Sequence, residues 1–221
     1  MSQFDDTFED LNSYLYNRLK QEIWNQVYQH GTKLRQEHLA KEYGVSRTPI
    51  LRVLERLTAE NILEYVPRRG FFVKRLSLDE MLNIFALREV LDGAAAKACA
   101  LHASDEDIEE IRQFFAKFQG KWSSDLEQEY VIVDQQFHSR LTKLSGNKLL
   151  QEINDSFSIN QFSYQKGLMR PPIETLAEHQ SIIHAIVERD PLKAQLLAME
   201  HIQKSMENIR LRFDEHKFPN R

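Results

Sequence analysis

Strand-forming segments occupy only one short stretch of this sequence, and their confinement there limits the fold more than any other feature. Residues 62–66 and 71–76 are rich in β-branched or aromatic side chains and flank a Pro-Arg-Arg-Gly tetrapeptide, a pattern typical of a two-stranded hairpin. From Ser77 onward the sequence shows helical periodicity with capping signals and no strand pattern. The sequence therefore predicts a mainly α protein with two domains, residues 1–76 and 77–221.

The segment before the hairpin predicts three helices. A stripe of apolar residues spaced about four apart indicates a first helix that ends near His30 and Gly31. Two short helices should follow, with Gly44 supplying the permissive backbone of the tight turn between them and Ser46 capping the second. Helix, tight turn, helix and hairpin wing in this order predict a winged helix-turn-helix. The apolar stripe of the first helix consists of Phe8, Leu11, Leu15, Leu19, Ile23 and Val27.

A winged helix-turn-helix places the start of its second short helix at the base edges of the DNA major groove. There Arg47 can donate two hydrogen bonds to a guanine, and neighbouring hydroxyl groups can hold phosphates. The basic tip of the hairpin suits the minor groove. A protein–protein module whose arginines only face solvent is the alternative interpretation. The predicted DNA-binding residues are Arg35, Ser46, Arg47, Thr48, Arg52, Arg68, Arg69 and Gly70.

The charge of the chain is distributed unevenly between the two predicted domains. The net charge of −4 combines a net +2 for residues 1–76, from 12 Lys+Arg and 10 Asp+Glu, with a net −6 for residues 77–221, from 17 and 23. Between Lys33 and Arg75 there are 10 basic and 5 acidic residues. This local excess favours binding of the phosphate backbone by the first domain.

The second domain is predicted to be an all-α six-helix bundle. Ser77 with Glu80 and Ser104 with Asp107 each form a capping box that begins a helix. The six expected helices cover about residues 77–102, 104 onward, 126–145, 148–169, 174–188 and 191–213.

Four residues of this bundle have the chemistry and the spacing of a metal site. Asp134 and His138 lie one turn apart on one helix face, and His179 and His201 each lie eleven residues from Asp190, in the turn between the last two helices. In an antiparallel hairpin these two histidines return to the same height, roughly 16 Å from the turn at about 1.5 Å per residue. Three imidazoles and one carboxylate suit zinc first, and nickel, manganese or iron as well. Histidines that only hydrogen-bond within a core are the alternative.

The string GVSRTPILRVLERL followed by PRRGFFV resembles the DNA-binding domain of the GntR family, over about residues 10–75. The resemblance implies a DNA-binding role for this domain. In that family the stretch after the proline usually has Arg followed by Glu, whereas this chain has Leu51 and Arg52. The arginine that Leu51 replaces is by resemblance a DNA contact, so the family does not imply the operator sequence of this chain.

The strings DQQFHSRLTKLSGNKLL and EHQSIIHAIVERDPLKAQLLAMEHI resemble the FCD-type ligand-binding domain of the FadR subfamily, over about residues 79–213. The resemblance implies a divalent metal held by one aspartate and three histidines. Their matches here are Asp134, His138, His179 and His201. It also implies that Arg88, in the string LREVLD, pairs with a carboxylate of the effector. Asp92 stands where that family more often has Glu.

These observations predict a metabolite-responsive transcription regulator that acts as a homodimer on double-stranded operator DNA and senses a small carboxylate through its metal-binding domain. The sequence has no stretch of about 18 apolar residues and no signal-peptide pattern, so a cytoplasmic protein without a membrane partner is expected. Two alternatives remain open: a metal-dependent enzyme, either a hydrolase or a non-haem oxygenase, and a DNA-binding protein whose metal is only structural. The effector, the operator, the metal, and the direction of the response also remain open.

Overall fold

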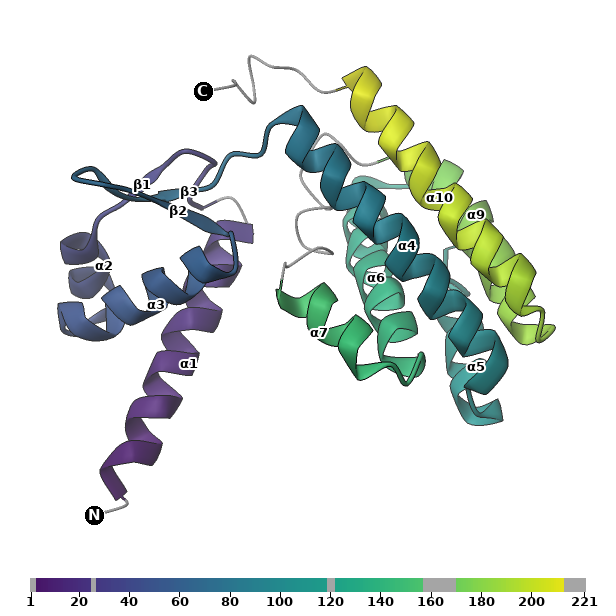
Figure 1. The fold of residues 1–221 in the computed structure, drawn as a ribbon, viewed down its shortest axis with the longest axis horizontal. Coiled ribbons are helices and arrows are strands. Elements are labelled where there is room, and N and C mark those ends of the chain that lie inside the picture. The colour runs from purple at the N-terminus through teal and green to yellow at the C-terminus, as the bar shows by residue number, and fades with distance from the viewer. Residues whose placement is uncertain (1–2, 25–26, 119–121, 157–169, 213–221) are drawn as a thin grey trace. The chain divides into compact units, whose positions relative to one another are not determined.

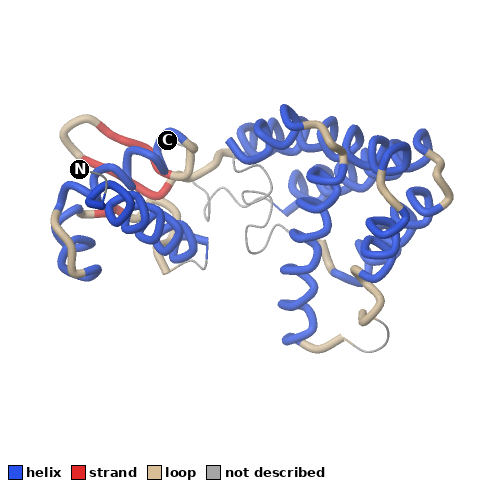
Figure 2. Tube along the Cα trace, turned by 90° about the horizontal axis from the view of Figure 1, so that it is seen from below, coloured by secondary structure: helices blue, strands red, loops and turns tan. Residues whose placement is uncertain are grey.

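The computed structural model describes residues 3–24, 27–118, 122–156 and 170–212. Contacts between Cα atoms divide the chain into two compact units, Met1–Arg75 and Leu76–Arg221. Within the described ranges, strands occur only in the first unit, and the regular elements of the second are all helices (Figure 2). The predicted fold class, mainly α with a winged helix-turn-helix and a helical bundle, is confirmed.

The first unit combines helices with a small antiparallel sheet (Figure 1). The strand order is β1-β3-β2, so β3 pairs with both neighbours. Helix α3 packs against α1, α2 and β2, and its apolar side chains Ile50, Leu54 and Leu57 are fully buried. The elements are α1 (Gln3–Trp24), β1 (Lys33–Leu34), α2 (Gln36–Tyr43), α3 (Arg47–Ala59), β2 (Leu63–Val66) and β3 (Gly70–Val73).

One prediction for this unit is wrong, and a second, the hairpin, is confirmed but incomplete. Helix α1 ends at Trp24 rather than near Gly31, and Val27, which was assigned to its apolar stripe, is exposed. The chain has to leave the helix direction here because Lys33 and Leu34 pair with β3. These two residues form β1, so the expected two-stranded hairpin is part of a three-stranded sheet. A strand of two residues is too short to show an alternating pattern in the sequence.

The turn between α2 and α3 is built as the sequence predicts, with one difference. Gly44 ends α2 with φ +68°, a left-handed conformation that glycine adopts without steric cost. Ser46 occupies the N-cap position of α3, but its side chain makes no capping hydrogen bond. Its hydroxyl group therefore does not satisfy the backbone at the start of the helix, in contrast to the expected cap.

The wing turn between β2 and β3 carries a strained arginine. The N–H of Arg69 donates to the carbonyl of Val66 at 3.0 Å, and Arg68, between Pro67 and Arg69, has φ +64°. Proline followed by a residue with positive φ is the pattern of a type II turn, whose third position usually holds glycine. An arginine at this position keeps a cationic side chain at the tip at the expense of backbone strain.

The described part of the second unit is a bundle in which α4 packs along α10, with α9 beside α10 and α6 also packed against α4 (Figure 1). Both predicted capping boxes are present at the starts of α4 and α5. The predicted helix over 148–169 is described only up to Ser156, and residues 157–169 lie outside the described residues. None of the described helices is both long and apolar enough to cross a membrane. The elements are α4 (Leu78–His102), α5 (Asp105–Gln113), α6 (Ser124–Leu144), α7 (Lys148–Ser156), α9 (Pro172–Val187) and α10 (Pro191–Arg212).

Candidate metal centre and nucleic-acid surface

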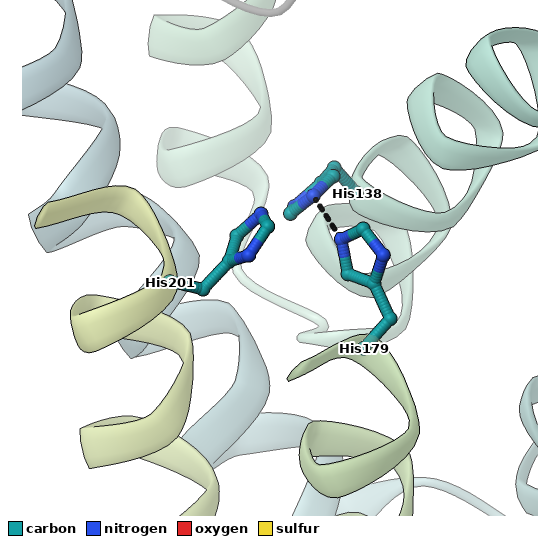
Figure 3. A group of neighbouring side chains, drawn as sticks. All are labelled: His138, His179 and His201. Carbon is teal, nitrogen blue, oxygen red and sulfur yellow. Dashed lines mark hydrogen bonds between the residues drawn. The ribbon is translucent and has the colours of Figure 1, made fainter. Parts of the chain in front are cut away.

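Three histidines from three helices meet inside the bundle (Figure 3). His138 comes from α6, His179 from α9 and His201 from α10, and all three side chains are buried. Each ring offers one nitrogen atom to the cluster, and these three nitrogens all lie within 4.8 Å of one another. The α9–α10 hairpin brings His179 and His201 to the same level, as their equal distance from Asp190 in the sequence predicts.

The Nδ1 atom of each imidazole lies close to a different partner, in a hydrogen bond for His179 and His201 and without an aligned hydrogen bond for His138. Nδ1 of His138 lies 2.9 Å from Oδ2 of Asp92 on α4. Nδ1 of His179 hydrogen-bonds with the hydroxyl group of Tyr130 at 2.7 Å. Nδ1 of His201 hydrogen-bonds with Oε2 of Glu178 at 2.8 Å. The Nε2 atoms of His138 and His179 face each other and lie 3.3 Å apart, in the hydrogen bond drawn as a dashed line in Figure 3. Outer partners on the other nitrogen of each ring are what fix the orientation of metal-binding histidines.

Asp134 adds a carboxylate oxygen to the same cluster. Its Oδ1 atom lies 2.9 Å from Nε2 of His179 and 3.7 Å from Nε2 of His138. This buried oxygen has no correctly aligned hydrogen-bond donor among the described residues. A buried carboxylate oxygen that faces two imidazole nitrogens without accepting a hydrogen bond fits the donor set of a divalent cation.

Burial sets the protonation states within the cluster. Burial lowers the pKa of His201 to about 3, and the neighbouring His179 acts in the same direction. Burial and the positive charge of Arg88 lower the pKa of His138 below its ordinary value. Burial alone would raise the pKa of Asp134, but the coulombic influence of His179 and the other nearby histidines lowers it overall. The neutral imidazoles of His138 and His201 and the ionised carboxylate of Asp134 are protonation states that metal binding requires.

Arg88, the predicted effector-binding residue, lies next to the cluster. Its side chain is buried, and its Nε atom donates to Oδ2 of Asp92 at 3.1 Å. The same Oδ2 atom lies against Nδ1 of His138. Burial alone would raise the pKa of Asp92, but the positive charge of Arg88, with a contribution from the adjacent His138, lowers it overall. Arg88, Asp92 and His138 thus form a continuous polar connection that ends at a candidate metal ligand.

Two outer partners were not identified from the sequence. Tyr130 also hydrogen-bonds with Thr175 at 2.8 Å, and Glu178 is held by both Arg170, at 2.7 and 2.9 Å, and Lys204, at 2.9 Å. The contacts of Tyr130 with Thr175 and of Glu178 with Lys204 connect different helices, and Arg170 precedes α9, so no spacing within one helix indicates them. Asp92 was noted only as a departure, although its position four residues after Arg88 is the spacing of an ion pair within a helix.

The predicted DNA-binding residues lie on the surface of the first unit. Arg47 is at the start of α3, and its Nη2 atom lies 2.9 Å from Oε1 of Glu37 in α2. Both side chains are about two-thirds exposed, at 68% and 72%. At the wing, the guanidinium of Arg69 lies 5.3 Å from the centre of the Phe72 ring. The remaining predicted residues are also exposed, except the half-buried Gly70; they are Arg35, Ser46, Thr48, Arg52 and Arg68.

Both units match known protein families. The FCD domain family matches residues 83–204, and the bacterial regulatory proteins of the gntR family match residues 11–73. The chain is 26% identical over 208 residues to the HTH-type transcriptional regulator YdhC of Bacillus subtilis, covering 91% of this chain and 92% of that protein. It is 27% identical over 180 residues to the Nta operon transcriptional regulator of Aminobacter aminovorans, covering 81% and 85%. These families and relatives are transcription regulators, not enzymes.

Solved structures share the fold. Escherichia coli McbR/YncC aligns with a TM-score of 0.72 at 18% identity and covers 92% of this chain and 99% of its own. A transcriptional regulator described as GntR, from Rhodococcus sp. RHA1, aligns with a TM-score of 0.76 at 14% identity and covers 93% and 100%. At these identities the likeness concerns the fold alone.

Proposed function

This chain belongs to the GntR family of transcription regulators and carries an FCD domain, and from that premise we propose that it is a metal-dependent sensor of a small carboxylate. In this proposal the first unit binds operator DNA, and the second unit controls that binding as part of a homodimer. The observation that carries the proposal is the buried cluster of His138, His179 and His201, with Oδ1 of Asp134 2.9 Å from Nε2 of His179.

The residues present fit a divalent metal, with zinc the first candidate. Three imidazoles and one carboxylate are a donor set that zinc, nickel, manganese and iron all accept. The metal would be held by Asp134, His138, His179 and His201. When bound, it supplies a positive charge with open coordination positions, to which a carboxylate ligand can bind.

Arg88 gives the proposed effector a second point of attachment. Its guanidinium contacts Asp92, and Asp92 in turn contacts His138. An effector carboxylate that competes with Asp92 for the guanidinium would change the contacts of both Arg88 and His138. Charge-assisted hydrogen bonds of this kind are the strong ones, which supports a carboxylate over a neutral ligand.

Metal analysis combined with thermal shift tests this function. We expect the purified protein to contain close to one divalent ion per chain, and small carboxylic acids from a screen to raise its melting temperature. Chelation should abolish that shift. Replacing Arg88 by Ala should reduce the effect of the best carboxylate on operator binding, while DNA affinity without ligand stays nearly unchanged.

Three outcomes would contradict parts of the proposal. A protein free of metal after purification and after metal addition would remove the metal site. A metal-loaded protein that responds to no carboxylate would favour a purely structural metal. An undiminished ligand response in the Arg88→Ala variant would remove Arg88 from the mechanism.

A further inference from the structure

The guanidinium of Arg47 already has an anionic partner in the protein. Arg47 begins α3 and Glu37 lies in the first turn of α2, and the helix-turn-helix brings Nη2 and Oε1 to 2.9 Å. The two are ten positions apart in the sequence and lie on different helices, so the contact depends on how α2 packs against α3. A carboxylate therefore lies directly beside the residue that is proposed to read a base.

This ion pair contributes little to the fold. Both side chains are largely exposed, and exposed pairs of this kind typically stabilise a protein only slightly because water screens them. The apolar contacts that hold the two helices together come from other residues, such as Leu39, Ile50 and Leu54. The effect of Glu37 is therefore expected at the DNA surface rather than in stability.

A carboxylate at this position affects the binding of random DNA and of operator DNA differently. On random DNA, an arginine gains affinity by contacting phosphate, which carries no sequence information. Here Arg47 would exchange the carboxylate of Glu37 for a phosphate, and Glu37 would then face the negative backbone without its partner. On a guanine the exchange is unnecessary, because the contact with Glu37 uses Nη2 and a guanidinium has further N–H donors for two hydrogen bonds to a base.

We propose that Glu37 is a specificity-determining residue, which holds Arg47 for guanine and reduces its binding to phosphate. The inference rests on the proposed base-reading role of Arg47. Glu37 obtains this selectivity by lowering the affinity for sequences other than the operator, which is a common way for a protein to become selective. It is a positioning residue for Arg47, so its removal should strengthen DNA binding overall while weakening discrimination.

The test compares full-length variants on two kinds of DNA. The wild-type protein first selects its operator from a random duplex library, and dissociation constants are then measured for this operator and for a random duplex. In Glu37→Gln, we expect affinity for the random duplex to rise roughly three- to tenfold and affinity for the operator to rise less. The ratio of the two affinities should therefore fall. Glu55→Gln is the matched control, because Glu55 is exposed about two turns further along α3 and no contact with Arg47 is found.

A second pair of variants separates Glu37 from Arg47. In the Arg47→Ala background, Glu37→Gln should leave the affinity ratio unchanged, since the residue that it positions is gone. An unchanged ratio in the Glu37→Gln single variant, or an equal fall in Glu55→Gln, would overturn the inference about Glu37. If Arg47→Ala itself selects the same operator as the wild type, the base-reading role of Arg47 is wrong, and the inference is overturned with it.

Discussion

At the residue scale, the three imidazoles of the cluster are alike in burial but differ in what holds them. His138 and His201 have carboxylate partners, Asp92 and Glu178, whereas His179 has the neutral hydroxyl group of Tyr130. A carboxylate partner increases the basicity of an imidazole as a metal ligand. His138 and His201 are therefore expected to be the stronger ligands of the set.

Removing one of these stronger ligands should deplete the metal. The variant His201→Ala is expected to purify with well under one metal ion per chain, because three remaining ligands bind a divalent ion more weakly. His184→Ala is the control, since His184 is exposed on the same hairpin and lies outside the cluster. Elemental analysis of both variants provides the measurement. Full metal content in His201→Ala would contradict the four-ligand site.

The lowered pKa values of the cluster predict how the metal-free protein responds to acid. A histidine in an unfolded chain has a pKa of about 6.5, whereas burial lowers the pKa of His201 to about 3 in the folded protein. Between these values the unfolded state binds more protons than the folded state. The free energy of unfolding should therefore decrease as the pH falls below about 6.5. The lowered pKa of His138 acts in the same direction.

Urea unfolding of the metal-free protein near pH 7.5 and near pH 5.5 measures this effect. The variant His201→Gln should lose less stability between the two pH values than the wild type, because it lacks one of the titrating groups. An equal loss in both proteins would show that His201 does not contribute to the pH dependence.

At the element scale, features that depend on neighbouring residues in the sequence were predicted better than features that depend on contacts between elements. The capping boxes at Ser77 and Ser104 and the turn at Gly44 each depend on a few neighbouring residues, and all three are present. The strand β1 was missed because it exists only through its pairing with β3. Tyr130 was missed as a partner of His179 for the same reason, since only the packing of α6 and α9 brings the two together.

The wing turn shows an element whose sequence does not suit its backbone. Because Arg68 has φ +64°, replacing it by Gly should leave stability unchanged or raise it by up to about 1 kcal/mol. DNA binding should nevertheless weaken because one cationic contact is lost. The slope of the logarithm of DNA affinity against the logarithm of salt concentration should become shallower by about one. Titrations at several salt concentrations, with thermal unfolding in parallel, measure both effects. Unchanged DNA affinity would mean that the wing tip does not contact DNA.

At the scale of the whole molecule, the chain consists of two units with different chemical character. The basic excess lies in the helix-turn-helix and wing, whereas the cluster of buried histidines lies in the helical bundle. Residues on α6, α9 and α10 form the candidate metal site, and Asp92 on α4 supports it. A bound ion would therefore join three helices of one unit, with α4 supporting one of its ligands.

Chelation should consequently destabilise one unit selectively. An ion that binds only the folded bundle, at a concentration far above its dissociation constant, adds about 3–4 kcal/mol to the free energy of unfolding. For a unit of this size this corresponds to a melting temperature higher by about 10 °C. Scanning calorimetry with and without chelator should show this decrease for the bundle, while the transition of residues 1–75 stays in place. An equal shift of both transitions, or no shift, would contradict this expectation.

The symmetry of the α9–α10 hairpin also limits how this protein can change in length. His179 and His201 lie opposite each other because eleven residues separate each of them from Asp190. A single insertion between His179 and the turn would move one imidazole by about 1.5 Å along its helix and rotate it by about 100°. Substitutions on the exposed positions of this stretch leave the register intact, whereas insertions and deletions do not. Descendants of this gene can therefore vary the exposed residues of the hairpin, but they can alter its length only by compensated changes in both helices at once.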